Sequence, residues 1–510
     1  MINGAQIMVK CLENEGVSVV FGYPGATICP FYDALMDSSI RHILVRQEQN
    51  AAHAASGYTR SCGKPGVCIA TSGPGATNLI TGLATAYMDS IPLIAITGQV
   101  RSDLLGRDVF QEADITGSCE PFTKHSYLVK NTADLPRVFK EAFHIATTGR
   151  PGPVLIDIPI DIQQHELPDF TYPEKAEIIG YKPRTQGHPL QIKKALELIS
   201  HSERPVICAG GGVLSSGGKR ELVAFAEATG IPVVSTMMGI GVMPSEHPLY
   251  LGMLGSHGLK AANRAIHEAD LLILCGARVG DRAVASPNQI TEKAKVIHID
   301  IDPAEIGKNM TVHIPIVGNI HLVLKSFNEK IHYHVSDQWT ATVQEWKETL
   351  RSVPPVFEGY VEPRSFIREL SSLLPSKSIY VADVGQNQIW SANNFRTTAG
   401  RFLTTGGMGT MGYSIPAALG AKLARPTRPV LAVCGDGSFQ MSMNELGTIA
   451  QNHIGVKIIV MRNVRLGMVR ELQDNLYQGR HSATILDETL DFQKIAEAYG
   501  IPSQMVSNNE

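Results

Sequence analysis

The run RPVLAVCGDGS, residues 428–438, with VKIIVMRN, residues 456–463, decides the fold. Each is a short apolar segment that ends in glycine or polar residues, and a helical segment lies between them. This alternation is typical of parallel strands joined by crossover helices. The two runs therefore predict a strand, helix and strand of a doubly wound α/β sheet, with ligand-binding residues after the strands.

Similar apolar runs fall into three groups along the chain. The first group is VSVVFGYPG (17–25), HILVR (42–46), GVCIATSGPG (66–75), IPLIAITGQV (91–100) and GPVLIDIPI (152–160). The second is RPVICAGGG (204–212), IPVVSTMMG (231–239), ADLLILCGAR (269–278) and KVIHIDID (295–302). The third adds SIYVADVGQ (378–386) to the two runs above. We expect an α/β protein with three tandem doubly wound parallel-sheet domains.

The expected domains cover residues 1–167, 188–330 and 365–510. A linker over 331–364 would contain a helix in WTATVQEWKETLRSV (339–353), followed by an extended stretch, PPVFEGYVEPRS (354–365).

Composition favours a soluble enzyme that acts on small molecules. Hydrophobic residues make up 44% of the 510 residues, and the formal net charge is −3. The chain therefore lacks the basic field that nucleic acid or an anionic membrane would require. It has no apolar run of the roughly 20 residues that cross a bilayer, and its first residues do not resemble a signal peptide. We expect a cytoplasmic protein whose eight scattered cysteines are reduced.

Asp436 and Asn463 predict a metal site, because each follows a strand of the third group. A carboxylate and an amide at the same sheet edge can hold Mg²⁺ bound to a diphosphate, since Mg²⁺ prefers oxygen ligands. Gly435 and Gly437 would let backbone amides approach the phosphate oxygens. The alternative is a strand-to-helix turn in which Asp436 only caps the helix.

Glu48 follows the strand HILVR and precedes a segment rich in small residues, AAHAASGYTR. Its carboxylate would face the crevice where open α/β sheets bind ligands. The alternative is an exposed glutamate in the first turn of a helix, where the helix dipole favours it. Gly210, Gly211 and Gly212 form a glycine-rich turn after another strand, which could admit a dinucleotide phosphate, although the spacing is not G-x-G-x-x-G.

Together with the run TSGPGATN (71–78), these features resemble the acetolactate synthase (acetohydroxyacid synthase) large, catalytic subunits, which depend on thiamine diphosphate (ThDP). The resemblance covers essentially the whole chain. Further matching motifs are FGYPG (21–25), AITGQ (95–99), FQE (110–112), KHS (124–126), GRPGP (149–153), DVGQ (383–386), GTMG (409–412) and RLGMV (465–469).

The resemblance implies three cofactors, namely ThDP, Mg²⁺ and FAD. Residues 1–167 would bind the aminopyrimidine of ThDP, residues 188–330 would bind FAD, and residues 365–510 would bind the diphosphate with Mg²⁺. The two halves of each active site would come from different subunits. A homodimer or a dimer of dimers would result, with a possible small regulatory subunit.

The resemblance also assigns roles to single residues. Glu48 would hydrogen-bond the pyrimidine N1′, and Met411 would support the bent conformation of the cofactor. Gln111 and Lys124 would line the substrate channel, and Arg278 would contact the flavin. For Met411 the alternative is a core methionine, and for the last three it is surface or interdomain salt links. The other expected cofactor contacts are Pro24, Gly25, Gly385, Gln386, Gly409, Gly437, Ser438, Leu466, Gly467, Met468, Gly210, Gly211, Gly212 and Asp300. The metal ligands would be Asp436, Asn463 and the backbone carbonyl of Arg465.

The implied reaction decarboxylates pyruvate on ThDP and condenses the hydroxyethyl enamine with pyruvate or 2-ketobutyrate. The products would be acetolactate or acetohydroxybutyrate, in branched-chain amino-acid biosynthesis. Two alternatives stay open, namely an FAD-free ThDP-dependent 2-keto acid decarboxylase or lyase, and a non-catalytic relative.

Four features depart from the family pattern. Gly25 is followed by Ala26 and Thr27 where the family usually has a second glycine. Arg462 replaces the usual uncharged polar or acidic residue before the metal-binding Asn463, and Leu472 stands where a tryptophan favours 2-ketobutyrate. The chain also ends at IPSQMVSNNE, short of the closing helix that members of the family usually have. Arg462 would place a positive charge beside the Mg²⁺ site, and Leu472 leaves the acceptor open between pyruvate and 2-ketobutyrate. A biosynthetic or a catabolic role, and full activity with Arg462 and the short C-terminus, also stay open.

Overall fold

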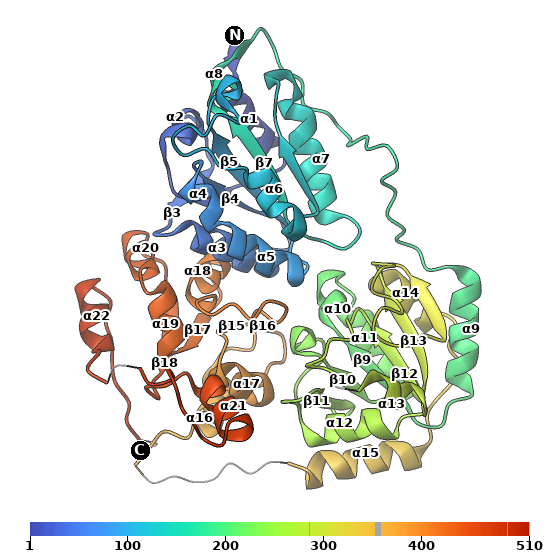
Figure 1. Ribbon diagram of the computed structural model, residues 1–510. Helices are drawn as coiled ribbons and strands as arrows, with labels where there is room; N and C mark the ends of the chain where they lie inside the picture. Colours follow the sequence, from blue (N-terminus) through green and yellow to red (C-terminus); the bar gives the residue numbers. More distant parts are fainter. Residues whose placement is uncertain (285, 352–358, 487, 509–510) are drawn as a thin grey trace. The chain divides into compact units, whose positions relative to one another are not determined.

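The computed structural model describes residues 1–284, 286–351, 359–486 and 488–508. Within these residues the strands form two six-stranded sheets, one four-stranded sheet and a two-stranded ribbon of β1 (Ile2–Asn3) and β8 (Glu166–Leu167) (Figure 1).

The first sheet has the strand order β3-β2-β4-β5-β7-β6, and its strands are parallel. They are β2 (Val19–Gly22), β3 (Arg41–Leu44), β4 (Gly66–Ala70), β5 (Leu93–Gln99), β6 (His125–Leu128) and β7 (Val154–Pro159). The chain passes from β2 outward to β3, then returns to add β4 on the other side of β2. The strand order therefore reverses between β2 and β4, which leaves a crevice at their carboxyl ends.

The second, central sheet repeats this plan with the order β11-β10-β9-β12-β13-β14. Its strands are β9 (Pro205–Ala209), β10 (Val233–Ser235), β11 (Tyr250–Met253), β12 (Leu271–Cys275), β13 (Lys295–Asp300) and β14 (Ile314–Val317). The reversal lies between β9 and β12. The third sheet, of order β16-β15-β17-β18, comprises β15 (Ile379–Ala382), β16 (Arg401–Leu403), β17 (Val430–Gly435) and β18 (Lys457–Met461), and it reverses between β15 and β17.

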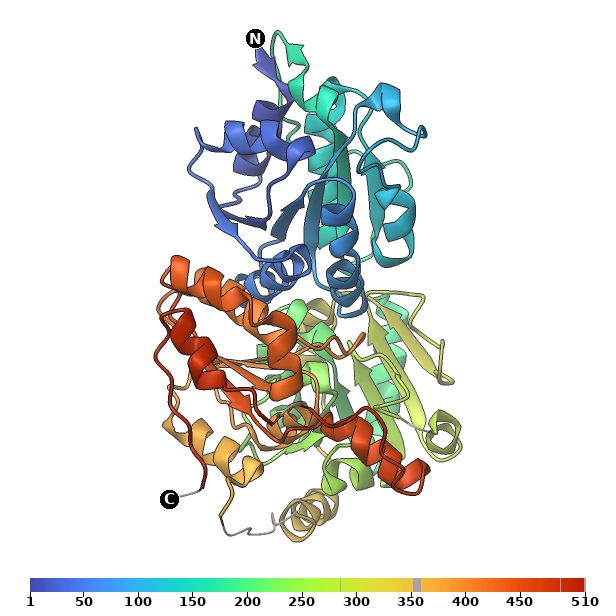
Figure 2. The ribbon, with the colours of Figure 1, turned by 60° about the vertical axis from the view of Figure 1, so that its left-hand side comes forward.

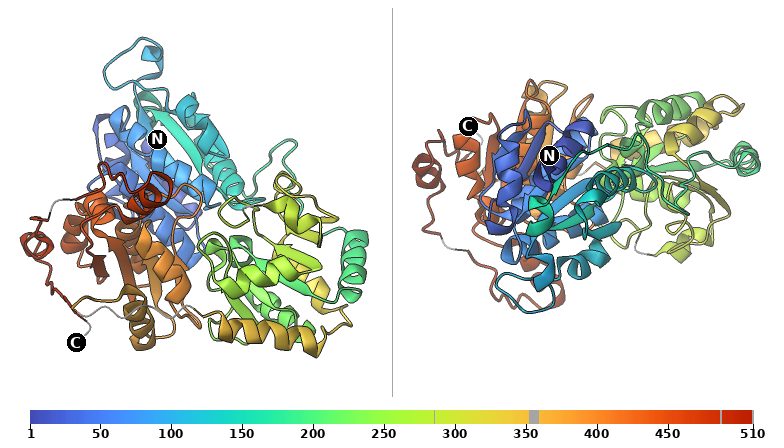
Figure 3. Two further views of the ribbon diagram at one scale, coloured as in Figure 1. Left: turned by 60° about the horizontal axis from the view of Figure 1, so that its bottom comes forward. Right: turned by 90° about the horizontal axis from the view of Figure 1, so that it is seen from above.

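Helices cover both faces of the central sheet, and successive strand residues alternate between two apolar cores (Figure 3). Ile207, Leu271 and Ile273 point into one core, whereas Val206 and Leu272 point into the other. Burial on both faces explains why these strands read as continuous apolar runs, since neither face meets water. The helices around this sheet are α9 (Pro189–Ser200), α10 (Gly211–Ser215), α11 (Lys219–Thr229), α12 (Lys260–Glu268), α13 (Pro287–Thr291), α14 (Ile320–Asn328) and α15 (Asp337–Thr349).

The first and third sheets share one apolar core. Its members include Phe21 and Ala95 of the first sheet and Val381 and Ala432 of the third. Two helices lie between the sheets, α3 (Glu48–Cys62) and α18 (Ser414–Ala424), drawn in blue and orange in Figure 2. The first sheet is also packed by α1 (Gly4–Asn14), α2 (Cys29–Leu35), α4 (Pro74–Asn78), α5 (Ile80–Met88), α6 (Ile115–Cys119), α7 (Leu135–Thr147) and α8 (Ile160–Gln164).

Backbone contacts cluster the chain into two compact units. One unit comprises residues 1–181, 379–386 and 403–505, and the other comprises 182–378, 387–402 and 506–510. The remaining helices are α16 (Pro363–Leu373), α17 (Gln386–Asn394), α19 (Asp436–Ser442), α20 (Glu445–Gln451), α21 (Gly467–Leu476) and α22 (Phe492–Ala498). Short 3-10 turns lie at Ala26–Ile28, Ser102–Leu104, Glu120–Phe122, Thr132–Asp134 and Met237–Gly239.

The predicted fold class is confirmed, and every apolar run used for it contains a strand. The helix expected in the linker corresponds to α15, while residues 352–358 of the expected linker lie outside the described residues. No helix in the described part of the chain is both long and apolar enough to cross a membrane.

The crossing of α3 and α18 depends on glycine. A Cβ atom at Gly420 would lie 1.8 Å from the carbonyl oxygen of Ala54, and one at Gly57 would lie 1.9 Å from that of Ala417. Both distances are far below van der Waals contact. The two helices therefore approach backbone to backbone at these residues.

We predict that Gly420→Ala destabilises the protein by about 1–3 kcal/mol, as overpacking of a core does. An alanine inside a helix would otherwise stabilise it by roughly 0.5–1 kcal/mol over glycine, so the sign of the change is diagnostic. Chemical denaturation measures it. Gly447→Ala in α20 is the matched control, because the nearest atoms there, at 3.2 Å, belong to the side chains of Arg46 and Tyr499, which can move. Equal stability of Gly420→Ala and the wild type would contradict the close crossing.

Candidate functional site

The three reversals of strand order are the natural places for ligands, because the loops that leave neighbouring strands there diverge and open a crevice. In the third sheet the reversal lies between β15 and β17, which are followed by Gly385-Gln386 and by Asp436. In the first it lies between β2 and β4, followed by Tyr23-Pro24-Gly25 and by residues 71–75.

Asp436 is the first residue of α19 and is only 3% exposed. Its Oδ2 accepts hydrogen bonds from the backbone N–H groups of Asn463 (3.1 Å) and Val464 (2.6 Å), and its Oδ1 accepts one from Gly437 (3.0 Å). The carboxylate thereby fixes the loop that leaves β18. It also holds the Asn463 backbone against the start of α19.

The Asn463 side chain lies at the same edge of the third sheet. Its Nδ2 is 3.4 Å from Oε1 of Gln386, and its Oδ1 accepts a hydrogen bond from the Arg465 backbone (3.0 Å). Gly467 borders both, since a Cβ there would lie 2.0 Å from the Gln386 oxygen. The structure thus brings Asp436, Asn463, Gln386 and Gly467 together. Asp436 also fixes the loop after β18. This structural role resembles the alternative interpretation, in which Asp436 only caps the helix.

Met411 lies beside the same turn. Its Cε is 3.6 Å from the position that a Cβ would take at Gly437, and Leu466 is 3.0 Å from that position. The loop containing Met411 is bounded by Gly409 and Gly412, both with positive φ angles of 66° and 85°, which favour glycine. Ser438, 1% exposed, bonds the backbone of Gly435 and so supports the turn from within.

Asp383 is a residue of this site that the sequence analysis quoted in a motif without giving it a role. It is fully buried and accepts backbone hydrogen bonds from Val384, Gly412 and Ser414 (2.8–2.9 Å). Burial raises the pKa of this carboxyl group, and the bonds from Ser414, Gly412 and Val384 partly offset that effect. Asp383 therefore ties the end of β15 to the Met411 loop. Its position directly after an apolar run was the available signal.

Arg462 does not point toward Asp436. Its guanidinium donates to the carbonyl oxygen of Glu488 and lies 5.8 Å from the centre of the Phe492 ring. The cation is therefore held by α22 and the residues before it, and the charge conflict that its position in the sequence suggested does not arise here.

Glu48 begins α3 and is 9% exposed, so it is not the exposed first-turn glutamate of the alternative interpretation. Its Oε2 accepts a hydrogen bond from the side chain of Asn78 (2.9 Å), and its Oε1 lies 3.3 Å from the Cβ position of Gly75. Gly25 lies against Thr71, whose side chain would be 2.5 Å from a Cβ there.

Thr27, one of the departures from the family pattern, is accommodated by hydrogen bonds. Its hydroxyl is 3.0 Å from that of Thr71 and accepts the Ser72 N–H at 3.0 Å. The additional side chain thus joins the loops that follow β2 and β4.

Gln111 and Lys124 differ in their surroundings. Gln111 has a positive φ angle of 59°, uncommon outside glycine, and packs against Gly73 at the loop after β4. The Lys124 ammonium instead donates to the carbonyl oxygens of Ile145 and Thr148 and to the Tyr181 hydroxyl. Glu48, Asn78 and Gly75 form what we call the Glu48 cluster, and Gln111 lies near it. Lys124 is instead held by the end of α7 and the loop after it.

Glu445 was missed by the sequence analysis. It is fully buried in α20, and its Oε1 accepts from the Arg46 N–H (2.9 Å) and the Asn50 side chain (3.0 Å). Burial raises the pKa of Glu445, and the Thr448 hydroxyl, the Arg46 N–H, Asn50 and the Arg46 charge oppose that shift. Glu445 fixes the chain on both sides of Glu48. Nothing in its sequence context distinguishes it from an ordinary helical glutamate.

The Asp436 cluster comprises Asp436, Asn463, Gln386 and Gly467. No hydrogen bond between described residues joins Glu48 to Asp436 or to Asn463. No group of three or more His, Cys, Asp or Glu side chains within the described ranges forms a metal site. The single carboxylate and the amide fit a cation such as Mg²⁺, which takes its other oxygen ligands from phosphate and water.

The central sheet brings its glycine turn to the reversal between β9 and β12. A Cβ at Gly210 would lie 2.2 Å from the Gly276 carbonyl oxygen, and one at Gly212 would lie 2.7 Å from the Gly276 Cα. Close backbone packing therefore accounts for these two glycines. Arg278 is partly exposed just beyond, and Asp300, 8% exposed at the end of β13, accepts the Asp302 N–H (2.9 Å).

Three family models match the chain. They describe the thiamine pyrophosphate enzyme N-terminal TPP binding domain (residues 2–118), central domain (192–327) and C-terminal TPP binding domain (383–510). The first and third matches contain the Glu48 and Asp436 clusters, respectively.

Curated relatives are similar over nearly the whole chain. A probable acetolactate synthase large subunit from Methanocaldococcus jannaschii is 48% identical over 99% of this chain and 88% of its own length. The acetolactate synthase large subunit from Corynebacterium glutamicum is 46% identical over 100% of this chain and 83% of its own length. The one from Buchnera aphidicola subsp. Schizaphis graminum is 44% identical over 100% of this chain and 90% of its own length.

Proposed function

Because the chain belongs to the acetolactate synthase family of thiamine-diphosphate enzymes, we propose that it decarboxylates pyruvate and joins the remaining two-carbon unit to a second 2-keto acid. Pyruvate as acceptor gives acetolactate, and 2-ketobutyrate gives acetohydroxybutyrate, both in branched-chain amino-acid biosynthesis. The observation that carries this proposal is the pairing of Asp436 with Asn463 at the strand-order reversal of a sheet that matches the C-terminal TPP binding domain.

The diphosphate end of the cofactor is proposed to bind at the third sheet. Asp436, the Asn463 side chain and the Arg465 carbonyl would hold Mg²⁺, whose charge would help to bind the diphosphate. Gly437 and Ser438 begin α19, where backbone N–H groups and the helix dipole favour an anion. The remaining proposed contacts line the same edge, namely Gly385, Gln386, Gly409, Leu466, Gly467 and Met468.

When bound, ThDP supplies the carbanion chemistry and the electron sink for decarboxylation. Glu48 would hold a proton between its carboxyl group and the pyrimidine ring nitrogen. The Asn78 amide donates to Glu48 Oε2 and so orients the carboxyl group. Oε1 then lies beside Gly75. Pro24 and Gly25 would border the pyrimidine. Met411, beside Gly437, would support the bent conformation of the cofactor.

Gln111 and Lys124 are proposed as substrate-channel residues. The support for Gln111 is its place beside Gly73, in the loop after β4. Lys124 would need to exchange its carbonyl partners for a substrate carboxylate. The central domain is proposed to bind FAD at Gly210–Gly212, Arg278 and Asp300. Its support is that these residues gather at one edge of the sheet, at or beside its strand-order reversal.

A homodimer or a dimer of dimers is proposed as the active form. Its support is that α21, next to the proposed metal ligands, exposes the apolar side chains of Val469, Leu472 and Leu476 at 46%, 49% and 68%. Relatives named as large subunits imply a small-subunit partner, which we propose to be regulatory.

We expect the purified chain, supplied with ThDP, Mg²⁺, FAD and pyruvate, to form acetolactate with one carbon dioxide released per product. The assay measures both products together. Release of carbon dioxide with acetaldehyde would instead identify a decarboxylase. Absence of turnover despite ThDP binding would identify a non-catalytic relative.

We predict that Asp436→Asn weakens Mg²⁺-dependent ThDP binding at least about tenfold, because the neutral amide loses the charge that a divalent cation requires. Titration of ThDP at fixed Mg²⁺ by calorimetry measures it. Asp491→Asn is the matched control, because Asp491 caps α22 in the same domain. Unchanged affinity of Asp436→Asn would reject Asp436 as a metal ligand.

We predict that Glu48→Gln lowers kcat at least about 100-fold, the usual contribution of a positioned acid or base. The Asn78 amide can still donate to the glutamine oxygen, so the fold and ThDP binding should persist. Acetolactate formation and circular dichroism measure the two effects. Glu166→Gln, at an exposed position of the ribbon strand β8, serves as control. Turnover equal to the wild type would remove Glu48 from the proton path.

A further inference from the structure

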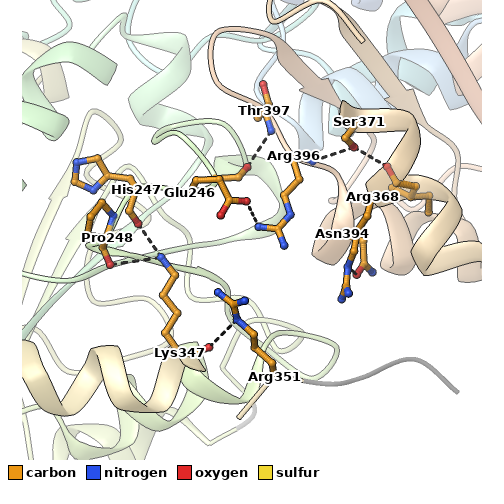
Figure 4. A network of polar contacts seen from close by, with 12 residues as sticks. Glu246, His247, Pro248, Lys347, Arg351, Arg368, Ser371, Asn394, Arg396 and Thr397 are labelled. Carbon is orange, nitrogen blue, oxygen red and sulfur yellow. Dashed lines mark hydrogen bonds and ion pairs between the residues drawn. The ribbon is translucent and has the colours of Figure 1, made fainter. Parts of the chain in front are cut away.

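A cluster of cations in the second compact unit has no part in the proposed reaction. It consists of Lys347, Arg351, Arg364, Arg368 and Arg396. These residues come from the end of α15 and the residue after its C-cap, from α16, and from the segment after α17. Lys347 and Arg396 contact the loop at 246–248 (Figure 4). We call this set the cation cluster. The tertiary fold therefore brings these positive charges together from separate segments of the chain.

Three members of the cation cluster are held by neutral acceptors. Lys347 Nζ donates to the carbonyl oxygens of His247 (2.8 Å) and Pro248 (3.5 Å), and Arg351 Nε donates to that of Lys347 (3.3 Å). Arg368 Nε donates to the side-chain oxygen of Asn394 (2.8 Å). These contacts orient the three cations but do not neutralise them.

Two carboxylates contact the other members. Glu246 pairs with Arg396, and Glu362 pairs with Arg364 at 2.9 Å. Among the described residues, two of the five cations are therefore paired with a carboxylate, and direct ion pairs leave the other three uncompensated. Burial lowers the pKa of Lys347 and of Arg368, and the neighbouring Arg351 and Arg396 lower both further, while Glu246 and Glu362 oppose these shifts. The cations repel one another, so an anion among them would be stabilised.

A cavity of about 180 Å³ adjoins the cation cluster. Its lining includes Ser245, Ser371, Ser376, Thr397, Glu246 and Arg396. Thr397 is 5% exposed, and its hydroxyl is buried with no hydrogen-bond partner in the structure. A buried hydroxyl without a partner costs about 1–3 kcal/mol. Thr397 therefore leaves a buried polar atom unsatisfied in the wall of this cavity.

We propose that the cation cluster and the Thr397 cavity form a binding site for a phosphate group, separate from the site for ThDP. Arginine presents a planar fork of N–H donors that matches phosphate oxygens, and the serine and threonine hydroxyls supply neutral donors. The cavity is several times the roughly 30 Å³ that a water occupies, so it admits a phosphate group. The phosphate is either free inorganic phosphate or part of a small phosphomonoester.

The test is calorimetric titration of the full chain, saturated with ThDP, Mg²⁺ and FAD so that the diphosphate site is filled. The probes are inorganic phosphate and glycerol 3-phosphate, at constant ionic strength maintained with chloride. The variants are Arg351→Gln alone and Arg351→Gln with Arg368→Gln. Arg220→Gln, at an exposed position of α11 in the same unit, is the matched control.

We expect the wild type and Arg220→Gln to bind at least one probe with equal affinity. The double variant should bind at least tenfold more weakly, and Arg351→Gln alone should lie between them. Arg351 is exposed and contacts a backbone carbonyl, so its single variant tests the proposal even if the double variant does not fold. Tighter binding of glycerol 3-phosphate than of phosphate would identify a phosphomonoester, and the reverse would identify the free ion. Binding of neither probe by the wild type, or equal affinity in wild type and variants, would overturn the proposal.

Discussion

The close crossing of α3 and α18 is the contact on which the catalytic half of the molecule depends. Gly57 and Gly420 let the two backbones touch, and this contact seals the core shared by the first and third sheets. Glu48 is the first residue of α3, and the Met411 loop leads directly into α18. One packing contact therefore sets the positions of two groups that the proposed chemistry needs. Their precision comes from rigid helices and not from the loops themselves.

Buried carboxylates do the local positioning around this crossing. Asp383, Asp436 and Glu445 each accept hydrogen bonds from backbone N–H groups of a different segment, and each is at most 3% exposed. Such bonds compensate the cost of burying a charge and order loops that would otherwise be mobile. Asp436 combines this role with the proposed metal contact. A substitution there would affect both the loop after β18 and the cation.

The second compact unit uses charge differently. Around the central sheet, Gly210 and Gly212 pack against Gly276 and join two turns through close backbone contact. In the cation cluster, by contrast, several positive charges are oriented by neutral oxygens and remain available to an anion. These charges lie on α15 and just after it, on α16 and on the segment after α17, outside the sheet whose carboxyl edge is proposed to bind FAD.

The sequence by itself determined the fold class, the central strands and the identity of Asp436 and Asn463 as neighbours. Strands buried on both faces must be continuously apolar, so their signal is local. The sequence analysis missed β6, β11, β14 and β16. All four lie at sheet edges, where one side lacks a neighbouring strand and the apolar pattern weakens. Only the tertiary structure decided that Arg462 turns toward Phe492, that Glu445 holds the start of α3, and that Lys347 and Arg396 meet at the loop 246–248. These depend on contacts between residues up to about 400 positions apart, which no local pattern encodes.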